Sequence, residues 1–228
     1  MKKYAVIVAG GKGLRMGTAV SKQFLPLHDK PILYHTIKAF VDAFSDIHLI
    51  LVLPADQLSY AQMVLQCFPE RIDATIVTGG PTRFHSVQNG LKECTIDSVI
   101  FVHDGVRPLV TVGLIQRCYE QALTKGTAIP AIAVTDSMRL VDEDDSEPIS
   151  RDALRIIQTP QTFRGDILLA AFKQQFSETF TDEATVVEAN GMNVDLIEGE
   201  RSNIKVTTPE DLLIAEALLQ SQNAKVKN

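Results

Sequence analysis

The sequence predicts a doubly wound α/β fold built on a mostly parallel sheet. Short apolar runs rich in β-branched residues alternate with segments of helical period, as they do in βαβ units. The runs are apolar on both faces, which is what a sheet covered by helices on both sides requires. Glycines and charged residues gather directly after several of these runs. Ligands of such folds bind beyond the carboxyl ends of the strands, so these residues are the first functional candidates.

The repeating part of this pattern occupies the first 134 residues. The predicted strands are Tyr4–Ala9, His48–Leu53, Ala74–Thr78, Ser98–His103 and Ala128–Val134. The predicted helices are Ile32–Ala43, Gln57–Cys67, Phe84–Glu93 and Val112–Lys125. Each helix connects two successive strands, so we expect these strands to be parallel.

The pattern changes after Val134. Residues 135–156 contain two short alternating stretches on either side of an acidic, proline-containing turn, which predicts a protruding β-hairpin. An isolated hairpin is marginal in water, so this one is expected to pack on another surface. The remaining predicted elements are helices near Arg164–Gln175 and from about Thr181, a strand at Asn193–Glu198 and a last helix from Thr208. We interpret residues 1–228 as one domain in which residues 135–156 form an arm.

The composition excludes several classes of protein. A net charge of −6 argues against general nucleic-acid binding, so any bound phosphate must be held by a local cluster of cations. No apolar run approaches the roughly 20 residues of a membrane span, and the N-terminus lacks the features of a signal peptide. The three cysteines are scattered, which predicts a reducing, cytoplasmic location and no structural zinc site.

A glycine-rich loop, AGGKGLRMG at residues 9–17, follows the first predicted strand. It fails the P-loop pattern, and Met16 stands where the dinucleotide-binding fingerprint needs its third glycine. Glycine N–H groups together with Arg15 and Lys22 favour a phosphate-binding loop. The alternative is a tight turn, for which glycine supplies the backbone freedom.

This loop and the following SKQFLPL resemble the opening of nucleotidyltransferases that join a nucleoside triphosphate to a sugar or polyol phosphate. Five further motifs resemble the 2-C-methyl-D-erythritol 4-phosphate cytidylyltransferases of the non-mevalonate isoprenoid pathway. These motifs are GGPTRFHSV (79–87), HDGVRP (103–108), RDALRIIQTPQTF (151–163), TDEA (181–184) and EGERSNIKVTTPEDL (198–212). The likeness extends from about Tyr4 to Leu219. Ribitol-5-phosphate cytidylyltransferases share part of this set and are the alternative, but TDEA and the Arg151-Asp152 pair favour the methylerythritol family.

The resemblance implies a Rossmann-like fold and a CTP-dependent cytidylyl transfer. A substrate phosphate oxygen would attack the α-phosphorus of CTP, and pyrophosphate would leave. Because both reactants are anions, the site must stabilise negative charge in the transition state. The catalytic cations that the resemblance implies are Arg15 and Lys22 at the α-phosphate, and Arg151 and Lys205 at the attacking phosphate. From the residues alone, Lys22 could equally be a surface lysine, Lys205 a strand-edge charge and Arg151 a partner of Asp152.

The resemblance also implies the binding residues. The nucleotide-binding residues would be Ala9, Gly10, Gly11, Gly13, Gly80, Arg83, Ser86, Asp104 and Gly105. The substrate-binding residues would be Asp104, Arg107, Ser137 and Thr181. Asp104 is also a candidate contact for Mg²⁺, since Mg²⁺ that bridges triphosphate oxygens keeps several waters and needs only one carboxylate; other divalent cations are compatible with this role. Alternative roles are a turn aspartate for Asp104, an unpaired first-turn residue for Arg83 and a helix N-cap for Thr181.

Two further interpretations concern partners and function class. The resemblance implies a homodimer, in which the arm crosses to the partner subunit. A nucleotide-binding module without turnover is the alternative from another class. The four cations Arg15, Lys22, Arg151 and Lys205 favour the enzyme, because a binding module does not need four cations around one phosphorus. An oxidoreductase on a Rossmann sheet is disfavoured by the failed fingerprint.

Overall fold

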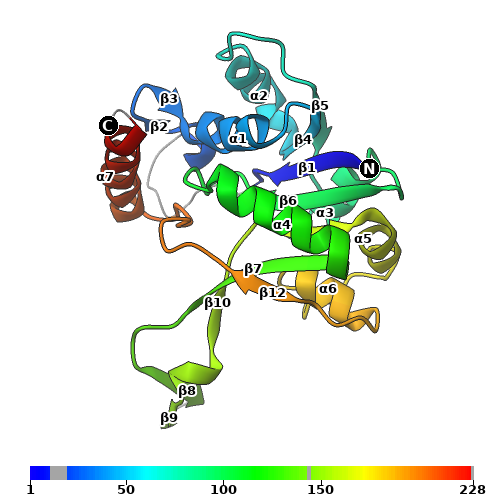
Figure 1. Cartoon of the computed structure of the whole chain (residues 1–228), viewed down its shortest axis with the longest axis vertical. Coiled ribbons are helices and arrows are strands. Elements are labelled where there is room, and N and C mark those ends of the chain that lie inside the picture. The colour runs from blue at the N-terminus through cyan, green and yellow to red at the C-terminus, as the bar shows by residue number, and fades with distance from the viewer. Residues whose placement is uncertain (11–19, 143–144, 227–228) are drawn as a thin grey trace.

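The computed structural model describes residues 1–10, 20–142 and 145–226, with side chains to residue 222, and places one large sheet at its centre (Figure 1). The parallel strands of this sheet are β1 (Lys2–Val8), β4 (Ile47–Leu53), β5 (Ala74–Thr78), β6 (Ser98–Asp104) and β7 (Thr127–Ala133). β1 pairs in parallel with β4 on one side and with β6 on the other, and β5 pairs with β4. The predicted α/β fold with a mostly parallel sheet is therefore confirmed.

Helices cover both faces of the sheet, because alternate strand residues point to opposite sides. The helices are α1 (Ile32–Ala43), α2 (Leu58–Leu65), α3 (Arg83–Leu91), α4 (Val112–Lys125), α5 (Gly165–Ala171), α6 (Glu183–Ala189) and α7 (Pro209–Val226). Ala5 and Ile7 of β1 pack in one core with residues of α1, α2 and α4. Tyr4 and Val6 pack in a second core with residues of α3, α5 and α6. The fold is doubly wound, as predicted.

Two antiparallel strands interrupt the parallel order, and they correct the predicted pattern. β10 (Arg155–Ile157) pairs with the second half of β7, so Arg155 and Ile156 belong to the main sheet and not to the hairpin. β11 (Gln161–Arg164) pairs with both β6 and β7. This short strand follows a proline and shows no clear alternation, which is why no strand was predicted there. β12 (Leu196–Glu198) is shorter than predicted and pairs in parallel with the opposite edge of β7.

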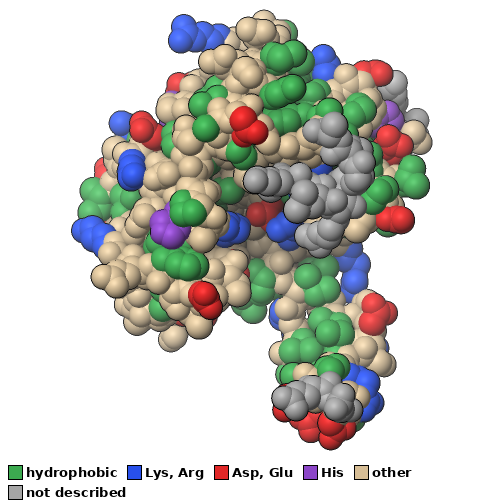
Figure 2. Space-filling view, turned by 180° about the vertical axis from the view of Figure 1, so that it is seen from behind, with side chains coloured by type: hydrophobic (Ala, Val, Ile, Leu, Met, Phe, Trp, Pro, Cys, Tyr) green, Lys and Arg blue, Asp and Glu red, His purple; other side chains and the backbone are tan. Residues whose placement is uncertain are grey.

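The predicted hairpin forms a separate two-stranded sheet that projects from the body (Figure 1). It consists of β8 (Met138–Asp142) and β9 (Asp145–Ile149), with Met138 opposite Ile149. All of its described residues are exposed. Figure 2 shows hydrophobic side chains along this arm.

A third, smaller core joins the C-terminal helix to the segment just before it and to the chain around β2 and the start of α1. Leu27, in the short strand β2 (Pro26–Leu27) that pairs with β3 (Lys30–Pro31), packs with Val206 and with Ala215 of α7. The Asp211 carboxylate accepts the backbone N–H of Thr208, which fixes the start of α7. This core anchors the chain next to Lys205.

In the described part of the chain, no helix has the length and apolar character needed to cross a membrane.

Candidate active site

The main candidate site is a pocket of about 310 Å³ beyond the carboxyl ends of β1 and β6. This is where the strand order reverses between β4 and β6, the usual position of ligands in doubly wound sheets. The lining residues are Val8, Ala9, Gly10, Lys22, Gln23, Gly80, Pro81, Thr82, Arg83, Ser86, Asp104, Val106 and Lys205. Figure 2 shows basic side chains in a hollow at the centre of this face. The pocket thus brings together residues from the glycine-rich loop, from SKQFLPL and from three of the five further motifs on which the resemblance rests.

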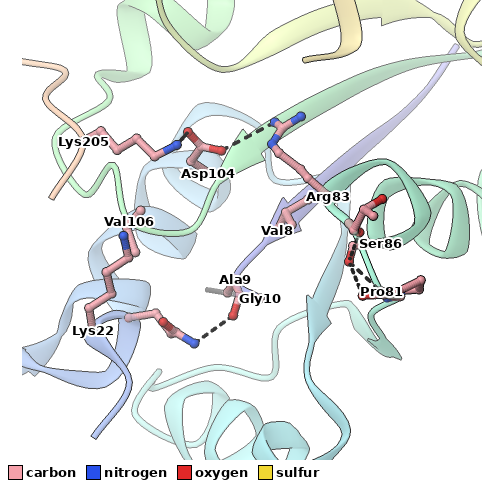
Figure 3. Close-up of a pocket in the computed structure, with 13 residues that line it drawn as sticks. Val8, Ala9, Gly10, Lys22, Pro81, Arg83, Ser86, Asp104, Val106 and Lys205 are labelled. Carbon is pink, nitrogen blue, oxygen red and sulfur yellow. Dashed lines mark hydrogen bonds and ion pairs between the residues drawn. The ribbon is translucent and has the colours of Figure 1, made fainter. Parts of the chain in front are cut away.

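Asp104, the last residue of β6, lies at the centre of the charges in the pocket (Figure 3). Its Oδ2 is 3.0 Å from Lys205 Nζ and 3.4 Å from Arg107 Nε, and its Oδ1 is 3.5 Å from Arg83 Nη2. Burial of the carboxylate opposes its ionisation, but the positive charges of Arg83, Lys205 and Arg107 outweigh burial and hold its pKa well below the ordinary value. Asp104 is therefore an anion at neutral pH.

Cations outnumber carboxylates in the pocket. Lys22, Arg83 and Lys205 line it, whereas Asp104 is the one carboxylate among the described lining residues. A concave site with this excess of positive charge attracts an anionic ligand, although the whole chain carries a net charge of −6.

Lys22 is held in the pocket by the short 3₁₀-helix Lys22–Phe24. Its side chain is largely buried, so the alternative of a solvated surface lysine is wrong. The next residue, Gln23, is fully buried and donates from Nε2 to the Ala9 carbonyl and to Gln57 Oε1, each at 2.7 Å. These bonds tie the 3₁₀-helix to the end of β1. Sequence reasoning did not single out Gln23, because nothing local indicates that its amide is buried.

The loop before α3 lines one side of the pocket and is held by hydrogen bonds of its own. The Gly80 N–H donates to Ser86 Oγ at 3.0 Å, and that hydroxyl donates to the Thr82 carbonyl at 2.9 Å. A Cβ at position 80 would lie 2.4 Å from the Cβ of His85, so glycine is required there. Arg83 opens α3 and is not unpaired: its guanidinium contacts Glu183 as well as Asp104.

Lys205 is not a strand-edge residue, contrary to the alternative drawn from its sequence alone, but belongs to an extended segment that is anchored on both sides. Asn203 is fully buried and donates from Nδ2 to the Thr159 carbonyl at 2.8 Å. The Asn203 carbonyl accepts from Arg107 Nη1 at 2.8 Å, and the Val206 N–H donates to the Val106 carbonyl at 2.9 Å. These bonds place the Lys205 ammonium against Asp104.

His103, in β6, is fully buried and contacts Thr159 and the Arg107 carbonyl. Its Nδ1 is 3.0 Å from Thr159 Oγ1, and its Nε2 is 3.2 Å from the Arg107 carbonyl. Burial lowers the pKa of His103 to about 4, so the imidazole is neutral. Because the Arg107 carbonyl can only accept, the single proton of the neutral ring is on Nε2 and donates to that carbonyl. Nδ1 therefore accepts from the Thr159 hydroxyl, whose oxygen also accepts the Asp104 N–H. His103 thus holds the loop in place as a packed residue near the end of β6.

Five other predicted site residues that the structure describes lie outside the pocket lining. Arg107 is buried, and its guanidinium contacts the Asp104 carboxylate. The Gly105 N–H donates to the Val8 carbonyl at 2.9 Å. Ser137 and Arg151 are exposed at the base of the arm, where the Arg151 guanidinium donates to the Thr135 carbonyl. Thr181 is exposed, and the N-cap of α6 is Asp182, so the N-cap alternative for Thr181 is wrong. Gly11, Gly13 and Arg15 lie outside the described residues.

The pocket fits a magnesium ion carried by a triphosphate better than an ion caged by protein ligands. Among the described residues, no group of three or more His, Cys, Asp or Glu side chains is arranged to hold a metal. Mg²⁺ in nucleotide sites is commonly held by one or two carboxylates together with phosphate oxygens and waters. The ionised Asp104 carboxylate matches that donor set.

Comparison with known proteins identifies the family of the chain. The family model for 2-C-methyl-D-erythritol 4-phosphate cytidylyltransferase matches residues 4–221. Proteins of that name from Phocaeicola vulgatus and Porphyromonas gingivalis are 46% and 43% identical to this chain, over 96% of its length and 100% and 99% of theirs. The crystal structure of the Thermus thermophilus protein of that name superposes with a TM-score of 0.78 at 31% identity, covering 96% of this chain and 100% of that one. The 4-diphosphocytidyl-2C-methyl-D-erythritol synthase of Anaerococcus prevotii gives a TM-score of 0.81 at 28% identity, covering 96% and 98%. The chain belongs to the 2-C-methyl-D-erythritol 4-phosphate cytidylyltransferase family.

Proposed function

We propose that this chain transfers a cytidylyl group from CTP to 2-C-methyl-D-erythritol 4-phosphate. The products are pyrophosphate and 4-diphosphocytidyl-2-C-methyl-D-erythritol, a precursor in the non-mevalonate isoprenoid pathway. The observation that carries the proposal is the cationic pocket at the strand-order reversal, in which Arg83 and Lys205 contact Asp104 and Lys22 lines the same pocket. Family membership favours the methylerythritol substrate over ribitol 5-phosphate, and no feature of the pocket favours the latter.

We assign each residue a separate role in the in-line transfer of the cytidylyl group. Gly80 and Ser86 line the side of the pocket that we assign to the base and ribose of CTP. Lys22 and, outside the described residues, Arg15 stabilise the charge that develops on the α-phosphate oxygens. Lys205 orients the attacking phosphate. Preorganised cations of this kind lower the barrier because they need not reorganise as the charge develops.

Magnesium is the proposed cofactor, with Asp104 as its protein contact. When bound to the triphosphate, Mg²⁺ neutralises phosphate charge and so helps pyrophosphate to leave. Ion pairs with Arg107 and Lys205 fix the Asp104 carboxylate, so it is oriented before any ligand binds.

A homodimer is part of the proposal. The arm exposes Met138, Leu140 and Val141, which are apolar side chains suited to a protein interface. Ser137 and Arg151 lie outside the lining of the pocket of their own chain. We therefore assign these two residues to the pocket of the partner subunit. The free thiols of Cys67, Cys94 and Cys118 fit a reducing, cytoplasmic location.

The deciding experiment measures pyrophosphate release. The protein is mixed with CTP, Mg²⁺ and either 2-C-methyl-D-erythritol 4-phosphate or ribitol 5-phosphate, and a third sample contains no polyol. Release with the methylerythritol substrate alone supports the proposal. Release with ribitol 5-phosphate alone changes the substrate, and CTP binding without any release indicates a module that does not turn over.

A further inference from the structure

Glu183 is a buried carboxylate to which the proposed mechanism gives no task. It is the first residue of α6, and its side chain is only 1% exposed. A carboxylate at such depth requires a counter-ion, because removing a charge from water is costly. The guanidinium of Arg83 provides it: Nη1 contacts Oε1, and Nη2 lies 2.9 Å from Oε2. The two groups therefore form a two-pronged ion pair between the first residues of α3 and α6.

Arg83 also faces the pocket, where it approaches the second carboxylate, Asp104 (Figure 3). That contact is 3.5 Å long, whereas Lys205 lies 3.0 Å from the same carboxylate. The charges thus form a row: Glu183, Arg83, Asp104 and Lys205. Burial alone would lower the pKa of Arg83, but the negative charges of Glu183 first and Asp104 second outweigh burial and raise it. Glu183 is the stronger partner of Arg83.

We propose that Glu183 is a positioning residue that acts as the counter-ion of Arg83 and so keeps this arginine from closing onto Asp104. This inference rests on the proposed function and adds a residue to it. While Glu183 holds the guanidinium, the Asp104 carboxylate stays oriented toward Lys205 and the bound nucleotide. Without Glu183, Asp104 is the nearest carboxylate to Arg83, and a direct Arg83–Asp104 pair occupies the group on which the ligand depends.

The backbone of Glu183 is fixed independently of this ion pair. Gln161 Oε1 accepts the Ala184 N–H and Gln161 Nε2 donates to Asp182, both at 2.8 Å. Asp182 and Thr185 form a capping box at the start of α6. Neutralising the Glu183 side chain therefore leaves the start of the helix in place, so its effect on Arg83 can be measured in a folded protein.

The first test compares Glu183→Gln with a matched control, Glu188→Gln. Glu188 lies on the same helix but is exposed, so the control removes the same charge without touching Arg83. We expect Glu183→Gln to raise the KM for CTP by about tenfold or more, the scale of one charge-assisted hydrogen bond, with a smaller change in kcat. The control should retain wild-type values of both constants.

A double-mutant cycle with Arg83→Gln then separates positioning from a general structural role. If Glu183 acts through Arg83, adding Glu183→Gln to Arg83→Gln leaves the KM for CTP unchanged. The melting temperature of the double variant should exceed that of Arg83→Gln, because the single change leaves Glu183 buried without its cation. The inference is overturned if Glu183→Gln raises the KM for CTP by the same factor in the wild type and in Arg83→Gln. It is also overturned if Glu183→Gln alone keeps the wild-type KM.

Two further measurements cover the cases in which the first test gives no result. If Glu183→Gln does not fold, Glu183→Asp takes its place: it keeps the charge but withdraws the carboxylate by one methylene, and a raised KM for CTP is again expected. If the wild type releases no pyrophosphate, the proposed function fails by itself. CTP affinity measured by calorimetry in the wild type and the variant then tests the inference, with equal affinities refuting it.

Discussion

Replacing Asp104 by asparagine tests the charge arrangement on which the proposed site depends. The side chain keeps its shape but loses the charge that Lys205, Arg107 and Arg83 share. Breaking a buried ion pair by removing one partner typically costs about 3–5 kcal/mol. Here each cation keeps some compensation. Arg83 retains Glu183, Arg107 retains the Asn203 carbonyl, and the Lys205 side chain is 44% exposed to water.

We therefore expect a loss at or just below the lower limit of that range, about 2–3 kcal/mol. For a domain of this size, such a loss lowers the melting temperature by about 4–12 °C. The assay is thermal unfolding without ligand at pH 7, with Asp42→Asn as the control. Asp42 forms an exposed ion pair with Lys38 on α1, and such pairs contribute about 0–1 kcal/mol.

The pH dependence adds a second check. The pKa of Asp104 is lowered in the folded state, so its contribution is complete above the pKa of the unfolded chain and is lost as the pH falls through the folded value. Both values lie below the neutral range, so the gap between variant and wild type should be constant from pH 8 to pH 5. A melting temperature within about 1 °C of wild type at pH 7 would refute the assigned charge network. A gap that shrinks between pH 8 and pH 5 would show that Asp104 titrates in the neutral range.

Three further predictions follow from the site and the arm. Lys22→Ala should lower kcat by about 10²–10³-fold, the usual effect of losing one preorganised donor, while circular dichroism stays unchanged; undiminished turnover contradicts its role. Removing residues 141–148 should leave a folded body whose dimer dissociates more readily in sedimentation, and a wild-type protein that sediments as a monomer at micromolar concentration contradicts the proposed assembly. Stability should fall by up to about 3 kcal/mol as the pH is lowered from 6.5 to 4, because the unfolded chain binds the His103 proton in that window and the folded protein does not. His103→Gln should lack this slope in chemical denaturation, and an unaltered slope argues against a neutral, buried His103.

The sequence was most informative where local pattern decides structure. The helices α1 and α4 have the predicted limits, since each combines an amphipathic period with a clear end. α4 stops at Gly126, whose φ of 92° suits glycine and almost no other residue. The parallel pairing of the strands followed from the same alternation. Strands β10 and β11 were not predicted because they are short and their pairing with β7 depends on distant residues.

In the candidate site too, residues with a local sequence signature were predicted and residues without one were not. Residues expected to touch a ligand, such as Lys22 and Asp104, stand in glycine-rich or charged motifs directly after strands, and the rule for doubly wound sheets places them together. The residues that hold them do not have such a signature. Gln23, Asn203 and Glu183 are polar side chains in positions where exposure is the ordinary expectation, yet each is almost completely buried.

Long-range partners explain why burial of these three residues could not be predicted from the sequence. Asn203 bonds to Thr159, 44 residues earlier, and Glu183 pairs with Arg83 across 100 residues. A buried polar group is stable only when such partners satisfy it, and no local pattern identifies them. These contacts also set the geometry of the cations in the pocket, because the chain next to Lys205 and the guanidinium of Arg83 are both held through them. Variation in activity within this fold should therefore arise from such supporting residues as well as from those that face the ligand, and the cycle between Glu183 and Arg83 measures that contribution directly.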